Sequence, residues 1–162
     1  MVLLRGSCHY ATVLERIGLR RMQGTASLTL LGKVRLLGRV WATAIQVQIA
    51  LWRRPLPDVV DGAERPAVRA SVPPARLSRA VSRGLRVGPF QPRCLVRSVV
   101  LYRLLRAQGD AAELVIGLPA RPTTSDAHAW VELAGWDVGP APGGSGHQEL
   151  TRYPREAARS GS

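Results

Sequence analysis

Between residues 28 and 53, apolar residues recur every three to four positions, which predicts an amphipathic helix. A second stripe at similar spacing is basic or polar. We expect the apolar stripe to pack against the rest of the protein. The alternative is that this basic helix, 28–53, docks a partner protein or contacts a membrane surface. The apolar stripe contains Leu30, Val34, Leu37, Trp41, Ile45 and Trp52, and the polar stripe contains Arg35, Arg39, Gln46 and Arg53.

A proline-rich segment follows this helix. Five prolines stand between Pro55 and Pro74, a composition that disfavours regular structure and suits a linker. The sequence thereby divides into three parts. Residues 1–27 are a terminal extension of unknown order, residues 28–74 contain the amphipathic helix and the linker, and residues 75–162 contain the main domain.

The main domain has the pattern of helices followed by antiparallel strands. Helical spacing covers residues 75–87 and 94–108. "AAELVIGL" then predicts a buried strand, and the alternating "AHAWVEL" predicts a strand with His128, Trp130 and Glu132 on one face. Ala134-Gly135 predicts a tight turn, and "WDV" a returning strand.

The tail that follows is rich in glycine and proline. We expect it to be a loop through Gly146, with His147 and Tyr153 capping the sheet. The alternative is that these two residues pack over the functional site or bind a peptide.

The charge of +12 first suggests a polyanionic partner. However, the arginines are spread from Arg5 to Arg159, Lys33 is the only lysine, and aromatic residues make up only 5% of the chain. Nucleic-acid binding requires a clustered basic surface and bases that stack on aromatic rings. We therefore expect no nucleic-acid partner.

The number of cysteines and the length of the apolar segments indicate the cellular compartment. Cys8 and Cys94 are the only cysteines, too few for a disulfide framework, and no cysteine and histidine cluster predicts a metal site. The start of the chain lacks the apolar run of a secretory signal. The most apolar window, residues 40–52, is shorter than the roughly 20 residues of a membrane span. We expect a cytoplasmic protein.

Cys94 is the first candidate for chemistry. It follows Pro92 and stands in the first turn of the predicted helix 94–108. The free N–H groups and the partial positive charge at a helix N-terminus favour a thiolate, which is the nucleophilic form of cysteine. The simpler interpretation of Cys94 is a small buried apolar residue.

The order of elements carries a resemblance. A cysteine at a helix start, a histidine on a following strand and an acid on the next strand resemble the α+β fold of transglutaminase-like and papain-like cysteine enzymes. More closely, "PRCLVRSVVLYRLLRAQGDAAELVIGLP" and "DAHAWVEL" with "GWDVGP" resemble the leader peptidases of lasso peptide biosynthesis. The resemblance covers residues 90–140, and "LLGRVWATAIQVQIALWRRPLP" is similar to the N-terminal region of that family.

This resemblance implies a function and partners. Residues 75–162 would be a cysteine peptidase core that removes the leader from a ribosomally made precursor peptide, with no cofactor. A separate leader-recognition protein would assist, and an ATP-dependent cyclase would then close the macrolactam ring. Cys94 would be the nucleophile and His128 the base.

The third catalytic residue implied is Asp137, and its position raises a geometric question. A two-residue turn pairs Leu133 with Trp136 and Glu132 with Asp137, about 13 Å along the strand from His128. Many family members place the acid near position 140, which is Pro140 here. A bulge or a different register could bring Asp137 closer, and Asp126 is another acid near His128.

Two further residues are candidates for supporting roles. Gln91 is a candidate oxyanion donor beside the backbone N–H of Cys94, or else a solvated loop residue. Trp130 either packs in the core or forms a platform for the substrate, and its indole could shield the imidazole of His128 from water. A transglutaminase-like acyltransferase and a non-catalytic adaptor of the same fold remain alternatives to the peptidase.

Overall fold

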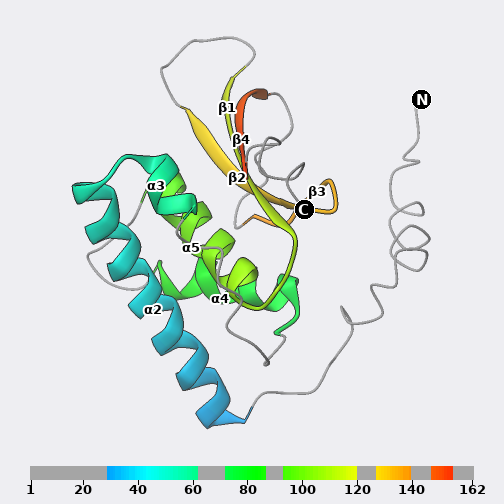
Figure 1. Ribbon diagram of the computed structural model, residues 1–162. Coiled ribbons are helices and arrows are strands. Elements are labelled where there is room, and N and C mark those ends of the chain that lie inside the picture. The colour runs from blue at the N-terminus through cyan, green and yellow to red at the C-terminus, as the bar shows by residue number, and fades with distance from the viewer. Residues whose placement is uncertain (1–28, 62–71, 87–92, 120–126, 140–146, 155–162) are drawn as a thin grey trace, which may run out of the picture.

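The computed structural model describes residues 29–61, 72–86, 93–119, 127–139 and 147–154. These residues form an α+β fold in which helices precede a small antiparallel sheet, as predicted (Figure 1). Gln91, Asp126 and Pro140 lie outside the described residues. The helices are α2 (Leu30–Arg53), α3 (Leu56–Asp61), α4 (Pro74–Gly84) and α5 (Cys94–Ala107), and the strands are β1 (Ala112–Pro119), β2 (His128–Leu133), β3 (Trp136–Asp137) and β4 (His147–Tyr153).

The strands lie in the order β3-β2-β1-β4, and all neighbours are antiparallel. Ala134 and Gly135 have φ values of +52° and +79°, which a tight hairpin turn requires at both of its central positions. Leu133 pairs with Trp136 and Glu132 with Asp137. The predicted hairpin and its register are therefore confirmed.

Helix α5 lies between the sheet and helix α2 (Figure 1). It is buried on several sides, and Val99, Val100 and Tyr102 are completely inaccessible to solvent. The hydroxyl of Ser98, also buried, donates a hydrogen bond of 2.7 Å to the backbone carbonyl of Ala129 in β2. This bond and the apolar packing fix the start of α5 relative to β2.

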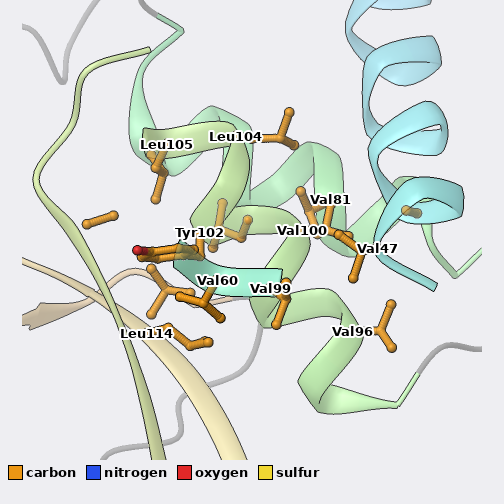
Figure 2. Packing of buried hydrophobic residues seen from close by; sticks show 14 of the residues in the cluster. Val47, Val60, Val81, Val96, Val99, Val100, Tyr102, Leu104, Leu105 and Leu114 are labelled. Atoms are coloured by element: carbon orange, nitrogen blue, oxygen red, sulfur yellow. The ribbon is translucent and has the colours of Figure 1, made fainter. Parts of the chain in front are cut away.

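A single apolar core joins the helices to the sheet. Figure 2 shows side chains from α2, α4, α5 and β1 within one cluster. Among its fully buried members are Val47 of α2, Val81 of α4, Leu101 of α5 and Leu114 of β1. Helix α2 thus contributes to the same core as the sheet.

The face of α2 that packs on this core is not the predicted one. Its buried residues are Val40, Ala44 and Val47. The predicted packing stripe instead faces mainly outward: Trp52 has 84% of its surface exposed, and Trp41 is half-buried. The prediction was wrong because α2 is apolar on two adjoining faces, and sequence spacing does not distinguish the face that meets α5. We call the outward residues the α2 stripe: Leu30, Val34, Leu37, Trp41, Ile45 and Trp52.

The segment expected to be a linker also differs from expectation. Leu56–Asp61 form the short helix α3 within residues 54–74, and its Val59 and Val60 are buried in the core. Pro57 stands in the first turn of α3, where a missing backbone N–H costs nothing. Burial of two valines therefore outweighs the low helix propensity of the local sequence.

Gly38 offers a test of the helical assignment of α2. It lies on an exposed part of the helix, and a Cβ added there would meet nothing within 4 Å. Gly38→Ala is expected to raise the free energy of unfolding by about 0.5–1 kcal/mol, because alanine loses less backbone entropy in a helix. Urea denaturation followed by circular dichroism measures this change.

Gly84 in α4 provides the matched control. A Cβ at Gly84 would lie 2.8 Å from Cδ1 of Leu37 in α2, so Gly84→Ala is expected to give no such gain. Equal stabilisation by both substitutions would contradict the described approach of α4 to α2.

Candidate active site

Cys94 is the first residue of α5, as the sequence predicts. Its thiol donates a weak hydrogen bond of 3.8 Å to the backbone carbonyl of Ala127. The first turn of α5 contains no acidic residue, so nothing in that turn counters the positive end of the helix dipole. The nucleophile candidate therefore stands at an electropositive helix end, directly beside the start of β2.

A cleft of about 710 Å³ brings Cys94 and His128 together. It lies where β2 begins, against the N-terminal turn of α5. The residues around it are otherwise mostly apolar, with one basic side chain at the helix start. The lining consists of Arg93, Cys94, Leu95, Ile116, Ala127, His128 and Ala129.

His128 lies among aromatic rings. Its imidazole stacks on the indole of Trp130, with 6.4 Å between the two ring centroids. The ring centroid of His147, in β4, lies 5.2 Å from that of His128. Burial is the largest effect and lowers the pKa of His128, the positive charge of His147 lowers it further, and the negative charge of Asp137 raises it. The imidazole is therefore held in its neutral form at neutral pH.

His147 lies beside His128, which agrees with the alternative that it packs over the site more than with the favoured expectation that it caps the sheet. It begins β4 and pairs with Pro119 of β1, which sets it on the same sheet face as His128. Its Nδ1 is buried without a hydrogen-bond partner among the described residues. The expectation that His147 caps the sheet is thus incomplete, because the ring also forms one wall around His128. No local signal could have placed it there, since the pairing of β4 with β1 is long-range.

Asp137 lies opposite Glu132, as the predicted register requires. One of its carboxylate oxygens accepts a hydrogen bond of 2.7 Å from the backbone N–H of Gly139. Its charge influences His128 in the direction expected of a catalytic acid, although as the smallest of the three effects. Its catalytic role stays a prediction.

Trp130 has only 3% of its surface exposed, so it supports His128 and offers little surface to a substrate. Its indole N–H donates a hydrogen bond of 2.9 Å to Glu132. Gly117, opposite His128 in β1, leaves the room that the indole needs: a Cβ there would lie 2.9 Å from the indole and 2.6 Å from the carbonyl oxygen of Gln148.

An ion-pair cluster centred on Arg152 joins neighbouring strands of the sheet close to Trp130. The guanidinium of Arg152 in β4 contacts Glu113 at 2.6 Å, Glu132 at 2.7 Å and Glu149 at 2.7 Å. The hydrogen bond with Glu149 is the largest effect and raises the pKa of Arg152, burial lowers it, and Glu132 and Glu113 raise it further. Three strands are thus joined side by side through one arginine.

The described residues contain neither a metal-binding cluster nor a membrane-spanning helix. No group of three or more histidine, cysteine, aspartate or glutamate side chains in those residues could hold a metal ion. No described helix is long and apolar enough to span a membrane.

Comparison with protein families then identifies the domain. The family model described as the transglutaminase-like superfamily matches residues 34–153. The chain belongs to the transglutaminase-like superfamily. No curated protein and no solved structure matches the chain significantly. The transglutaminase-like match begins within α2 and ends at the last residue of β4, so it includes both Cys94 and His128.

The charges around His128 predict opposite responses to two substitutions in this transglutaminase-like domain. His147→Gln is expected to raise the pKa of His128 toward its ordinary value of 6.5, because it removes a like charge. Asp137→Asn is expected to lower the pKa of His128, because it removes an opposite charge. The imidazole Cε1–H resonance of His128, followed by NMR as a function of pH, measures both shifts.

Other groups around His128 provide the control for this titration. Arg93 and Cys94 line the same cleft as His128, and the partner of His128 in β1 is the uncharged Gly117. Burial, His147 and Asp137 shift the pKa of His128, and Glu149 does not. Glu149→Gln should therefore leave this pKa unchanged. Shifts of the same sign in the His147 and Asp137 variants would contradict the described arrangement.

Proposed function

We propose that this protein is a cysteine peptidase that removes the leader peptide from a ribosomally made lasso peptide precursor. The observation that carries the proposal is the cleft shared by Cys94 and His128 within a transglutaminase-like domain. Enzymes of this superfamily typically combine cysteine, histidine and an acid. The resemblance of residues 90–140 to lasso leader peptidases supports the narrower choice of substrate.

The reaction divides into two acyl-transfer steps. Sγ of Cys94 attacks the carbonyl carbon of the scissile peptide bond while His128 accepts the thiol proton. The C–N bond breaks, the proton passes from His128 to the departing amine, and a thioester remains on Cys94. Water then adds to the thioester with His128 as the base, the C–S bond breaks, and the thiol is restored.

The surroundings of His128 suit the role of base. A general base must be unprotonated before the reaction and must lie within reach of the proton that it accepts. Burial and the neighbouring His147 lower the pKa of His128, so the neutral form dominates at neutral pH. Trp130 and His147 restrict the imidazole on two sides, which limits the orientations it can adopt.

The acid and the oxyanion donors complete the proposal. Asp137 acts on His128 through its charge, and the backbone N–H of Cys94 together with Gln91 stabilises the developing oxyanion. The partners are a precursor leader, a separate leader-recognition protein and an ATP-dependent cyclase that acts on the released core peptide.

The test is mass spectrometry of a candidate precursor incubated with the protein and a leader-recognition protein. A peptidase gives two fragments whose masses add to that of the precursor plus one water. Cleavage at one bond is the expected result. An intact precursor that still co-purifies with the protein would contradict the proposal and would indicate an adaptor.

An acyltransferase is the second candidate, because the same thioester can react with an amine. The superfamily match supports both reactions equally. The same assay repeated with an added primary amine separates them: a fragment heavier by the amine minus water indicates transfer, whereas the free carboxylic acid indicates hydrolysis.

A further inference from the structure

The outer surface of α2 is unusually apolar for an exposed helix. The α2 stripe extends along the helix for about 33 Å at 1.5 Å per residue, and Trp52, at its end, is 84% exposed. Continuous apolar surface of this kind marks sites of contact with other molecules. The proposed active site does not use it, although Leu37 within the stripe lies close to Gly84 of α4.

Two hollows adjoin the α2 stripe. One, of about 400 Å³, lies along the second half of the helix and is lined mainly by Trp41, Ile45, Ile49 and Trp52. The other, of about 420 Å³, lies between α2 and α4 over Leu36 and Leu37. Hollows of this size accept apolar side chains that project from a partner.

The hollow between α2 and α4 has basic walls, and we call it the basic groove. Lys33 of α2 and Arg76, Arg79 and Arg83 of α4 line it. Neither α2 nor α4 contains an aspartate or a glutamate. Arg76 already has a polar interaction in the structure, so the positive charges relevant here are those of Lys33, Arg79 and Arg83, which no acid of these two helices offsets.

We infer that the basic groove and the α2 stripe bind an acidic amphipathic segment of a partner polypeptide. Its apolar face would lie along the α2 stripe, and its carboxylates would meet the arginines of α4. This is the arrangement in which an amphipathic helix occupies a groove. The inference concerns a surface outside the cleft and does not rest on the chemistry of Cys94.

Two other occupants fit less well. A second copy of the chain would bring a second set of basic residues toward the first, because the surface contains arginines and lysine but no acid. A bilayer is flat and would leave a concave groove unfilled, whereas an inserted side chain fills it. Shape and charge together favour the acidic polypeptide.

The probe is a fluorescein-labelled synthetic amphipathic helix with leucine on one face and glutamate on the other. Binding to the full chain is measured by fluorescence anisotropy at low and high salt. We expect this peptide to bind at least about tenfold more tightly than a scrambled peptide of the same composition. We also expect the affinity to fall with salt, because the pairs are near the surface.

Matched double substitutions locate the site. Arg79→Glu with Arg83→Glu is expected to weaken binding at least about tenfold. The control is Arg35→Glu with Arg39→Glu, which has the same spacing, exposure and charge change but lies outside the groove. Leu37→Ser tests the apolar contact, with Leu150→Ser on β4 as its exposed control.

Several outcomes would overturn the inference. Equal loss in the two double variants would indicate nonspecific charge attraction. Binding to phosphatidylglycerol vesicles without binding to the peptide would assign the surface to a membrane. Self-association lost in Leu37→Ser, detected by analytical ultracentrifugation, would assign it to a second copy. Peptide binding that persists in Cys94→Ala supports the site whether or not the proposed peptidase activity is found.

Discussion

Cys94→Ala is expected to reduce precursor cleavage by roughly three orders of magnitude or more, because the variant lacks the thiol on which the proposed thioester forms. The fold should be retained. Cys94 packs at the edge of the cleft, is only partly buried and makes one weak hydrogen bond. Liquid chromatography with mass spectrometry measures the rate, and thermal unfolding measures stability.

The second cysteine of the sequence provides a matched control for Cys94. Cys8→Ala should leave the cleavage rate unchanged, and iodoacetamide should inactivate this variant as fully as it inactivates the wild type. Cleavage that survives in Cys94→Ala at more than a few per cent of the wild-type rate would contradict the role of this thiol.

His128→Gln is expected to lower kcat/KM by about 10²–10⁴-fold, the range typical of a lost general acid–base group. Glutamine keeps a polar side chain of similar length at the start of β2 but cannot accept the thiol proton. The variant should also lose the decline of activity that the wild type shows as pH falls through the lowered pKa of His128. The measurement is kcat/KM as a function of pH.

His147→Gln is the control for this second prediction. It should retain most of the activity at neutral pH and should move the acidic decline to higher pH, since it removes the like charge beside His128. If instead His147→Gln is inactive and His128→Gln is active, the two histidines have been assigned the wrong roles.

The parts of the fold that follow from the sequence are those with local causes. The start of α5 follows from Pro92 and the helical spacing after Cys94, and the hairpin register follows from a turn of two residues at Ala134-Gly135. The predicted order of helix, strand and hairpin brings Cys94 and His128 to the same end of the sheet. Local pattern was sufficient for these features.

The features that the sequence did not indicate depend on contacts between distant segments. Helix α2 packs through Val40, Ala44 and Val47 because those residues fit α5, and its own spacing favours the other face equally well. His147 reaches His128 only through the pairing of β4 with β1, which includes a shift of register between Ile116 and Gly117. Periodicity contains no information about either contact.

The position of Arg152 has a consequence for the order in which the protein becomes complete during synthesis. Arg152 and His147 both belong to β4, the last described strand. Arg152 pairs with the carboxylates of Glu113 in β1 and Glu132 in β2, and His147 lies beside His128. Chains emerge from the ribosome with their N-terminal segments first. A nascent chain therefore contains Cys94 and His128 before it contains Arg152 and His147, and the surroundings of His128 are complete only once β4 pairs with β1.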